Sequence, residues 1–456
     1  MSFRGILQLT GVGLVLCAGA LAIVPGIASG RADEPPRVMY PEFLEQYAAT
    51  YRFNLGKPAT IKLSPDGKTV LFLRSGPRTF VHTLYEYDVE KGEEKMVLTS
   101  EQVLGDKEET LTPEEQARRE RQRSTARGIA TFNMSEDGER IVVPLGGRLF
   151  GIHRPTRMKK ELALNPVPAI DPQFSPDGKK WACVRAGDLH VTELQSGREQ
   201  RITRRPAPNI SNGLAEFVAQ EEMDRSSGYW WSPDSNSIAY EQVDVAGVEF
   251  FSISDPTHAE RPATTWPYPR PGKKNASVKL GIIPAKGGET VWVQWDREKY
   301  PYLATVRWKK NSPLTILVQN RTQTEELLLA VEPTSGATTN LLTETDAAWL
   351  NIEQACPLWL DDGSGFLWMT ERGGAWQLEL HARDGKLLHT LTQPDFGLRT
   401  LLDADPRAGV AWVIASDDPT QAHLWRVPLD PSKGPPVKLT EAPGVHAAVF
   451  SKDHST

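Results

Sequence analysis

The chain has 456 residues and a formal net charge of −6, and without residues 1–32, which hold two arginines and no acid, that charge is −8. A negative chain argues against nucleic acid as a partner, because phosphate binding requires a basic face. The 39% of hydrophobic residues suffice for a large core, and 13 Trp, 36 Gly and 35 Pro indicate many strands joined by tight turns rather than a helical bundle.

Residues 1–32 are typical of a secretory signal peptide. Arg4 gives a positive start, an uncharged apolar run follows at about 11–27, and small residues at 28–32 suit cleavage. The alternative is an uncleaved anchor, since the run approaches the length of a membrane span. We favour cleavage, which predicts a periplasmic or secreted protein of residues 33–456 that meets a membrane only if the segment is retained.

The cysteines and histidines indicate neither a disulfide framework nor a cofactor. Cys17 lies in the signal segment, and the distant pair Cys183 and Cys356 is expected to be two buried free thiols, with a single bridge as the alternative. The nine histidines form no His-x-His or His-x-x-x-His pair, so we expect no metal site and no cofactor.

A repeated turn predicts the fold. Ser-Pro-Asp-Gly or a close variant precedes an apolar strand at 64–67, 135–138, 175–178 and 232–235, with degenerate copies at 359–363, 402–406 and 450–453. Pro presets the first central position of a type I turn, and Gly tolerates the positive φ that follows. Several copies are 40 to 57 residues apart, the length of a four-stranded blade. The sequence therefore predicts an all-β protein, a β-propeller of about eight blades with the last incomplete.

One departure from the repeat lies within residues 100–127. Thr112 suits an N-cap, Pro113 a first helical position and Glu115 the third, which predicts a short inserted helix that continues to Arg123. Its many arginines either form a solvated, salt-bridged face or send one guanidinium into a cavity.

A second departure, at 206–225, carries the adjacent carboxylates Glu221 and Glu222. Such pairs are common on solvated helix faces. If they face a cavity, two carboxylates can accept charge-assisted hydrogen bonds from an ammonium group. A peptide that continues upstream offers an uncharged amide instead, so the pair would select free peptide N-termini.

Two blocks, 217–225 (Phe-Val-Ala-Gln-Glu-Glu-Met-Asp-Arg) and 228–234 (Gly-Tyr-Trp-Trp-Ser-Pro-Asp), resemble the segment of the dipeptidyl peptidase IV family that carries paired glutamates. Residues 266–282 resemble the same family, and we expect a structural loop there. The resemblance implies the β-propeller of a serine peptidase of the prolyl oligopeptidase clan, in which Glu221 and Glu222 bind the peptide amine.

The resemblance also implies an arginine from 118–127 that holds a substrate backbone carbonyl. Several arginines of the inserted segment compete for this role, and Arg121 and Arg123 are our candidates.

The catalytic part of this family requires a Gly-x-Ser-x-Gly nucleophile elbow, and the sequence contains none. One hypothesis is the substrate-recognition and gating propeller of a secreted serine dipeptidyl peptidase that releases N-terminal dipeptides, partnered by a separate α/β-hydrolase chain or truncated. The alternative is a non-catalytic secreted propeller that binds peptides or a partner protein. Under either hypothesis we expect no peptidase activity from this polypeptide alone.

Overall fold

The computed structural model describes residues 40, 42–105, 109, 111, 113–162, 165 and 167–456. The signal peptide predicted for 1–32 and the proposed N-cap Thr112 lie outside these residues. Within them, no helix combines the length and apolar character needed to cross a membrane.

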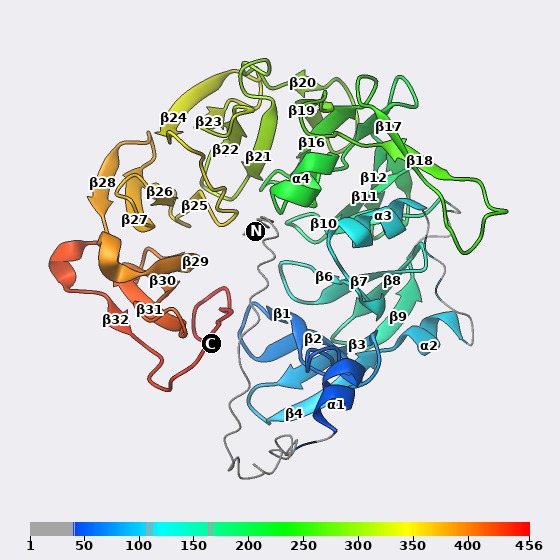
Figure 1. Cartoon of the computed structure of the whole chain (residues 1–456), viewed down its shortest axis with the longest axis horizontal. Coiled ribbons are helices and arrows are strands. Elements are labelled where there is room, and N and C mark those ends of the chain that lie inside the picture. Colours follow the sequence, from blue (N-terminus) through cyan, green and yellow to red (C-terminus); the bar gives the residue numbers. More distant parts are fainter. Residues whose placement is uncertain are drawn as a thin grey trace, which may run out of the picture.

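The described residues form seven sheets that follow one another along the chain, each with a path of four antiparallel, hydrogen-bonded strands, and Figure 1 shows them as blades around a central axis. The first three blades are β1 (Ala59–Leu63), β2 (Thr69–Ser75), β3 (Val81–Asp88) and β4 (Glu93–Leu98); β6 (Asn133–Met134), β7 (Arg140–Leu145), β8 (Arg148–His153) and β9 (Met158–Glu161); and β10 (Ile170–Phe174), β11 (Lys180–Arg185), β12 (Asp188–Glu193) and β13 (Glu199–Arg201). The short β5 (Arg127–Gly128) pairs in parallel with β3.

The fourth blade differs from the others because it carries two additions. Its strands are β14 (Ile210–Asn212), β15 (Tyr229–Trp231), β16 (Ser237–Asp244), β19 (Ser277–Pro284) and β20 (Val291–Trp292). The chain leaves the blade between β14 and β15, where both strands pair with β16, and again between β16 and β19, where it forms the separate hairpin β17 (Phe250–Ile253) and β18 (Thr264–Pro267).

The last three complete blades return to the simple pattern. They are β21 (Tyr302–Arg307), β22 (Leu314–Gln319), β23 (Glu325–Val331) and β24 (Thr338–Thr345); β25 (Leu358–Trp359), β26 (Gly365–Thr370), β27 (Gln377–Ala382) and β28 (Leu387–Thr390); and β29 (Leu398–Asp405), β30 (Val410–Ala415), β31 (His423–Pro428) and β32 (Val437–Lys438). The degenerate copy predicted at 402–406 falls mostly within β29, because this strand runs on to Asp405 and turns after it.

The repeated turns share one set of hydrogen bonds. In residues 64–69 the Ser64 hydroxyl donates to Asp66 Oδ1 at 2.6 Å and accepts from the Thr69 amide at 2.9 Å. Gly67 takes a φ of 67°, as the Pro-Asp-Gly sequence predicts. The same Ser and Asp bonds recur in the turns that begin at Ser135, Ser175, Ser232 and Ser451.

The copy at Ser451 lies beyond the seventh blade and occupies the position of an eighth. His454 Nε2 lies 3.1 Å from Asp403 Oδ2 of the seventh blade, and Lys452 Nζ lies 3.2 Å from Glu136 of the second. This segment forms a turn between the seventh blade and the first two. The predicted all-β propeller is confirmed, and the described residues form seven four-stranded blades.

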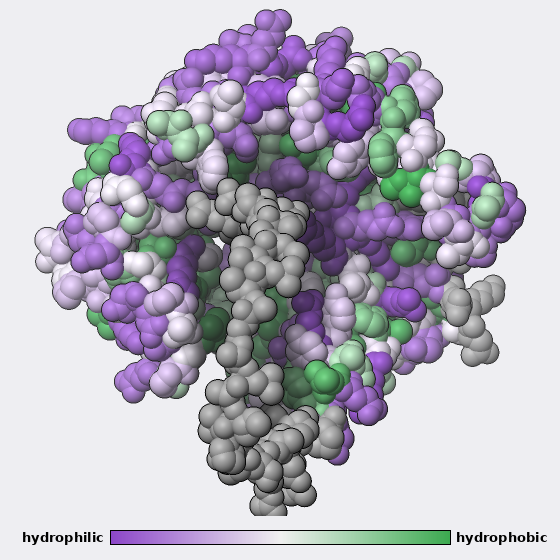
Figure 2. All heavy atoms as spheres, viewed as in Figure 1, coloured by the Kyte–Doolittle hydropathy of each residue, from purple (hydrophilic) through white to green (hydrophobic). Residues whose placement is uncertain are grey.

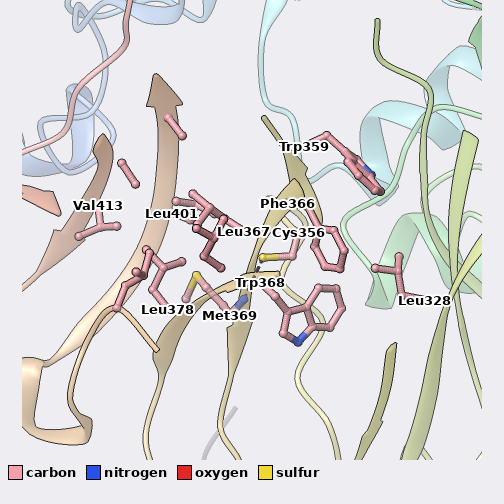
Figure 3. Packing of buried hydrophobic residues seen from close by; sticks show 14 of the residues in the cluster. Leu328, Cys356, Trp359, Phe366, Leu367, Trp368, Met369, Leu378, Leu401 and Val413 are labelled. Carbon is pink, nitrogen blue, oxygen red and sulfur yellow. Dashed lines mark hydrogen bonds between the residues drawn. The ribbon is translucent and has the colours of Figure 1, made fainter. Parts of the chain in front are cut away.

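The cores lie between blades rather than inside them, because each sheet has two apolar faces and needs a neighbour on both sides. One cluster joins the first and second blades, and others join each following pair. The largest spans the fifth to seventh blades and includes Leu328, Trp368 and Leu401 (Figure 3). Cys183 and Cys356 are buried free thiols, as predicted.

In the part of the chain that the structure describes, four short α-helices accompany the sheets, α1 (Phe43–Ala49), α2 (Ser100–Leu104), α3 (Pro113–Arg121) and α4 (Phe217–Glu222), with two 3₁₀ turns at Pro394–Phe396 and Pro431–Lys433. The inserted helix predicted to reach Arg123 is α3. It ends two residues earlier because Arg123 adopts a left-handed φ of 50°. The excursion at 206–225 contains α4.

Candidate functional site

The glutamate pair lies at the end of α4. Figure 1 shows this helix at the inner rim of the ring, and Figure 2, drawn from the same side, shows hydrophilic residues gathered there. Glu221 is half-buried and Glu222 is exposed. The opposite face of the helix, with Ala219 and Met223, is buried in the large cluster shared by the fifth to seventh blades. Packing against the core therefore fixes one face of α4, and the carboxylates of Glu221 and Glu222 lie on the other face, towards the surface.

Arg121, at the end of α3, lies against the same helix. Its guanidinium carbon is 5.0 Å from the ring centroid of Phe217, within the range of a cation–π contact. Burial lowers the pKa of the Arg121 side chain, and the nearby carboxylates of Glu221 and Glu216 oppose that shift. The structure thus brings together Arg121 and Glu221, which are 100 positions apart in the sequence.

The other arginines of α3 are held in ion pairs within their own segment. Arg118 Nε and Nη2 contact the two Glu115 oxygens at 2.8 and 2.9 Å. Arg119 is buried, bonds Glu109 Oε1 at 2.7 Å and also contacts Glu115. Arg118 and Arg119 thus form salt bridges, but they are largely buried rather than solvated, and Arg121 lies against α4.

Arg123, the second candidate, lies past the end of α3 and is exposed. Its backbone amide bonds the Glu120 carbonyl oxygen at 2.9 Å. The contacts of α4 described above belong to Arg121, so geometry separates two candidates that the sequence left equal.

Three aromatic rings contact one another at α4, the helix that carries Glu221 and Glu222. Phe217 meets Tyr268 edge to face at a centroid distance of 5.0 Å, and Tyr268 lies 5.7 Å from Phe251 of the β17–β18 hairpin. The stretch around Tyr268, expected to be a structural loop, forms β18 and the connection to β19. The ring of Tyr268 packs against Phe217, the residue over whose ring the guanidinium of Arg121 lies.

Three buried charged residues next to α4 were not predicted from the sequence. Glu216 is the N-cap of the helix, and Arg225 pairs with Glu241 of β16 at 2.5 Å; all three are at most 7% exposed. One signal was available, since Glu241 interrupts an apolar strand and a buried strand rarely holds an unpaired charge.

The arrangement offers two kinds of partner to a ligand. Two adjacent carboxylates suit a group with several N–H donors and positive charge, and a guanidinium close by suits an acceptor oxygen. The free N-terminus of a peptide carries both, an ammonium and the first carbonyl oxygens.

A pocket of about 850 Å³ lies between the second and third blades and is lined by residues such as Ile152, Phe174 and Leu194, away from α4. In the described ranges no group of three or more His, Cys, Asp or Glu side chains could hold a metal ion.

Comparison with known proteins gives one family. The family described as "Dipeptidyl peptidase IV (DPP IV) N-terminal region" matches residues 145–456. "Inactive dipeptidyl peptidase 10" of Mus musculus is 31% identical over 163 residues, which are 34% of this chain and 20% of that protein. "Probable dipeptidyl peptidase 4" of Neosartorya fischeri is 26% identical over 298 residues, 61% of this chain and 38% of that protein.

A solved structure has the same fold. The crystal structure of Porphyromonas gingivalis dipeptidyl peptidase 4 superposes with a TM-score of 0.73 at 19% identity, and the match covers 89% of this chain and 57% of that one. The chain therefore spans about a fifth to three fifths of the length of these proteins.

Proposed function

Because this chain belongs to the dipeptidyl peptidase IV N-terminal family, we propose that it is the substrate-recognition and gating propeller of a serine dipeptidyl peptidase. In this proposal it binds the free N-termini of peptides, and N-terminal dipeptides are released by a nucleophile that lies outside these 456 residues. The signal-like segment 1–32 supports export, so we place the protein in the periplasm or outside the cell.

The observation that carries the proposal is the meeting of α3 and α4. Glu221 and Glu222 end one helix, and Arg121 ends the other against Phe217. Charge-assisted bonds from the ammonium to the carboxylates would fix the first residue of a peptide. A bond from Arg121 to a backbone carbonyl would fix its direction.

Such a site fixes the position of a peptide relative to its free N-terminus. A peptide that extends upstream would bury an uncharged amide against two carboxylates and leave them without a cationic partner, which is unfavourable. The half-buried Glu221 should contribute more than the exposed Glu222, because solvent screens the outer carboxylate more strongly.

A non-catalytic binding propeller is the second candidate. One observation favours it: one of the relatives is named as an inactive dipeptidyl peptidase. Both candidates can use the same amine site. They differ in whether an α/β-hydrolase joins the propeller to form an active peptidase.

Two assays on the purified chain test the proposal. A Gly-Pro chromogenic substrate should not be hydrolysed by the chain alone, and a free Xaa-Pro dipeptide should bind while its N-acetylated form does not. Equal binding of both dipeptides would contradict the amine site. Hydrolysis that appears only when an α/β-hydrolase is added would favour the recognition propeller over the non-catalytic one.

A further inference from the structure

Three buried charged groups lie directly behind the helix that carries the glutamate pair. They are Glu216, Arg225 and Glu241, with exposed fractions of 7%, 5% and 0%. They come from the two ends of α4 and from β16. Because they are buried next to α4, they can act on a bound peptide only by holding this helix or through their charge.

Glu216 holds the start of α4. Its two carboxylate oxygens accept hydrogen bonds from the amides of Val218 and Ala219, each at 2.8 Å. Its own amide donates to Glu241 Oε1 at 3.2 Å. The Glu216 carboxylate thus satisfies two of the free N–H groups at the helix start, and the Glu241 carboxylate joins the Glu216 amide to a central strand of the fourth blade.

Two other side chains hold the end of α4 against β21 of the fifth blade. Arg225 bonds Glu241 Oε2 at 2.5 Å and the Leu303 carbonyl oxygen at 3.0 and 3.2 Å. Gln354 donates to the Met223 carbonyl oxygen at 2.5 Å and to the Ala304 carbonyl oxygen at 3.1 Å. The end of the helix is therefore fixed by bonds that do not depend on Glu216.

The charges in this cluster do not balance. Arg225 bonds Glu241 directly, and Arg121 of α3 is the other cation that acts on Glu216. Burial and the nearby Glu241 carboxylate raise the pKa of Glu216 to about 7. Among the described residues, the guanidinium of Arg225 pairs directly with Glu241 and lowers the pKa of Glu216 only through its charge.

We propose that Glu216 is a positioning residue for the amine site, and that its ionisation strengthens the binding of a peptide ammonium. This inference rests on the proposed function. An ionised Glu216 makes two charge-assisted bonds to α4, and charged acceptors bond more strongly than neutral ones. It also adds one negative charge beside Arg121 and Glu221, which favours a cation at the pair.

The consequence is a bell-shaped dependence of affinity on pH. As pH rises through 7, Glu216 loses its proton and affinity should rise about fivefold, a modest effect for one added charge at this range. At higher pH the peptide amine itself, with an ordinary pKa near 8, loses its charge and affinity should fall. The rise reports the ionisation of Glu216 in the protein, and the fall reports the deprotonation of the amine of the ligand.

The test is a titration of the whole chain with a free Xaa-Pro dipeptide at steps of pH between 5.5 and 8.5. Glu216→Gln should lose the rise near pH 7 and keep the fall near pH 8. Glu216→Asp, which keeps an ionisable N-cap, should retain a rise. Binding by the Gln variant with an unchanged rise would overturn the role of Glu216 and leave the proposed function standing.

A second measurement decides the role of Glu216 without any ligand. Hydrogen–deuterium exchange of amides 217–223, corrected for the intrinsic rate, should slow as pH passes 7 in the natural chain and not in Glu216→Gln. Equal profiles would overturn the inference. If no dipeptide binds at any pH while the exchange profiles differ, the proposed function fails and the proton-dependent hold on α4 remains.

Discussion

The repeated turns and the excursion that carries α4 are stabilised over very different distances along the chain. In a turn such as 175–180 the serine bonds residues two and five positions away. In the excursion, Arg225 bonds residues 16 and 78 positions away, and Gln354 bonds Met223 across 131 positions. The turns can form from local chemistry, whereas the excursion takes its shape only when the fourth and fifth blades are assembled.

The two regions also differ in what a change in each can affect. The Ser and Asp turn recurs at five places in the described residues, so the loss of one turn should weaken the ring without reshaping it. The excursion sets the position of Glu221 and Glu222. A change there can therefore affect both stability and dipeptide binding, whereas a change in a turn should affect stability alone.

Arg225→Met should have the largest effect. It leaves Glu241, which is fully buried, without its cation, and breaking such a pair costs about 3–5 kcal/mol of unfolding free energy. Denaturation in urea measures this loss. The double variant Arg225→Met/Glu241→Gln should recover part of it, since no unpaired charge remains; a single variant as stable as the natural chain would contradict the comparison.

Arg121→Lys should weaken dipeptide binding about tenfold and leave stability almost unchanged. Lysine keeps the positive charge and the contact with Phe217 but loses the planar fork that suits a carbonyl oxygen. Calorimetric titration gives the affinity. Arg123→Lys is the matched control and should bind normally; the reverse pattern would assign the role to Arg123.

Glu326 makes a regular blade sensitive to pH without involving the site. This carboxyl is 3% exposed on β23, opposite Glu344 of β24, and burial and Glu344 raise its pKa to about 8. The folded chain keeps a proton that the unfolded chain releases above its ordinary pKa, so stability should fall as pH rises from about 4.5 to 8, by about 1.4 kcal/mol per unit.

Glu326→Gln should reduce the slope of stability against pH by about 1.4 kcal/mol per unit over this range, as measured by urea denaturation at several pH values. The variant should bind the dipeptide with the pH profile of the natural chain. A changed binding profile would mean that blade and excursion are coupled, against the comparison drawn here.

Ser175→Ala should have the smallest effect. The hydroxyl donates to Asp177 at 2.6 Å and accepts from the Lys180 amide at 3.0 Å, and its loss should cost about 1 kcal/mol. Thermal denaturation measures this change. Dipeptide affinity should stay within twofold, and a larger change in affinity would show that this turn influences the site.

The sequence predicted the features that depend on local chemistry. The Ser-Pro-Asp-Gly turns and the start of α3 at Pro113 follow from residues with strong local preferences. α1, α2 and α4 have five to seven residues, too few for a helical periodicity to be recognised.

The partners of the glutamate pair could be predicted only in part. A resemblance suggested an arginine, but the choice between Arg121 and Arg123 depends on where α3 ends and which way the chain then turns. The bonds of Arg225 and Gln354 to β21 join two blades, and no local pattern encodes them.

Calorimetric titration with a free Xaa-Pro dipeptide tests the central claim most directly. It compares the natural chain with Glu221→Gln/Glu222→Gln and with Glu289→Gln/Glu298→Gln, a control that removes two exposed carboxylates elsewhere. We predict binding by the natural chain and the control, and none by the first variant. Binding that survives the loss of Glu221 and Glu222 would contradict the assignment of this pair as the site of the peptide amine.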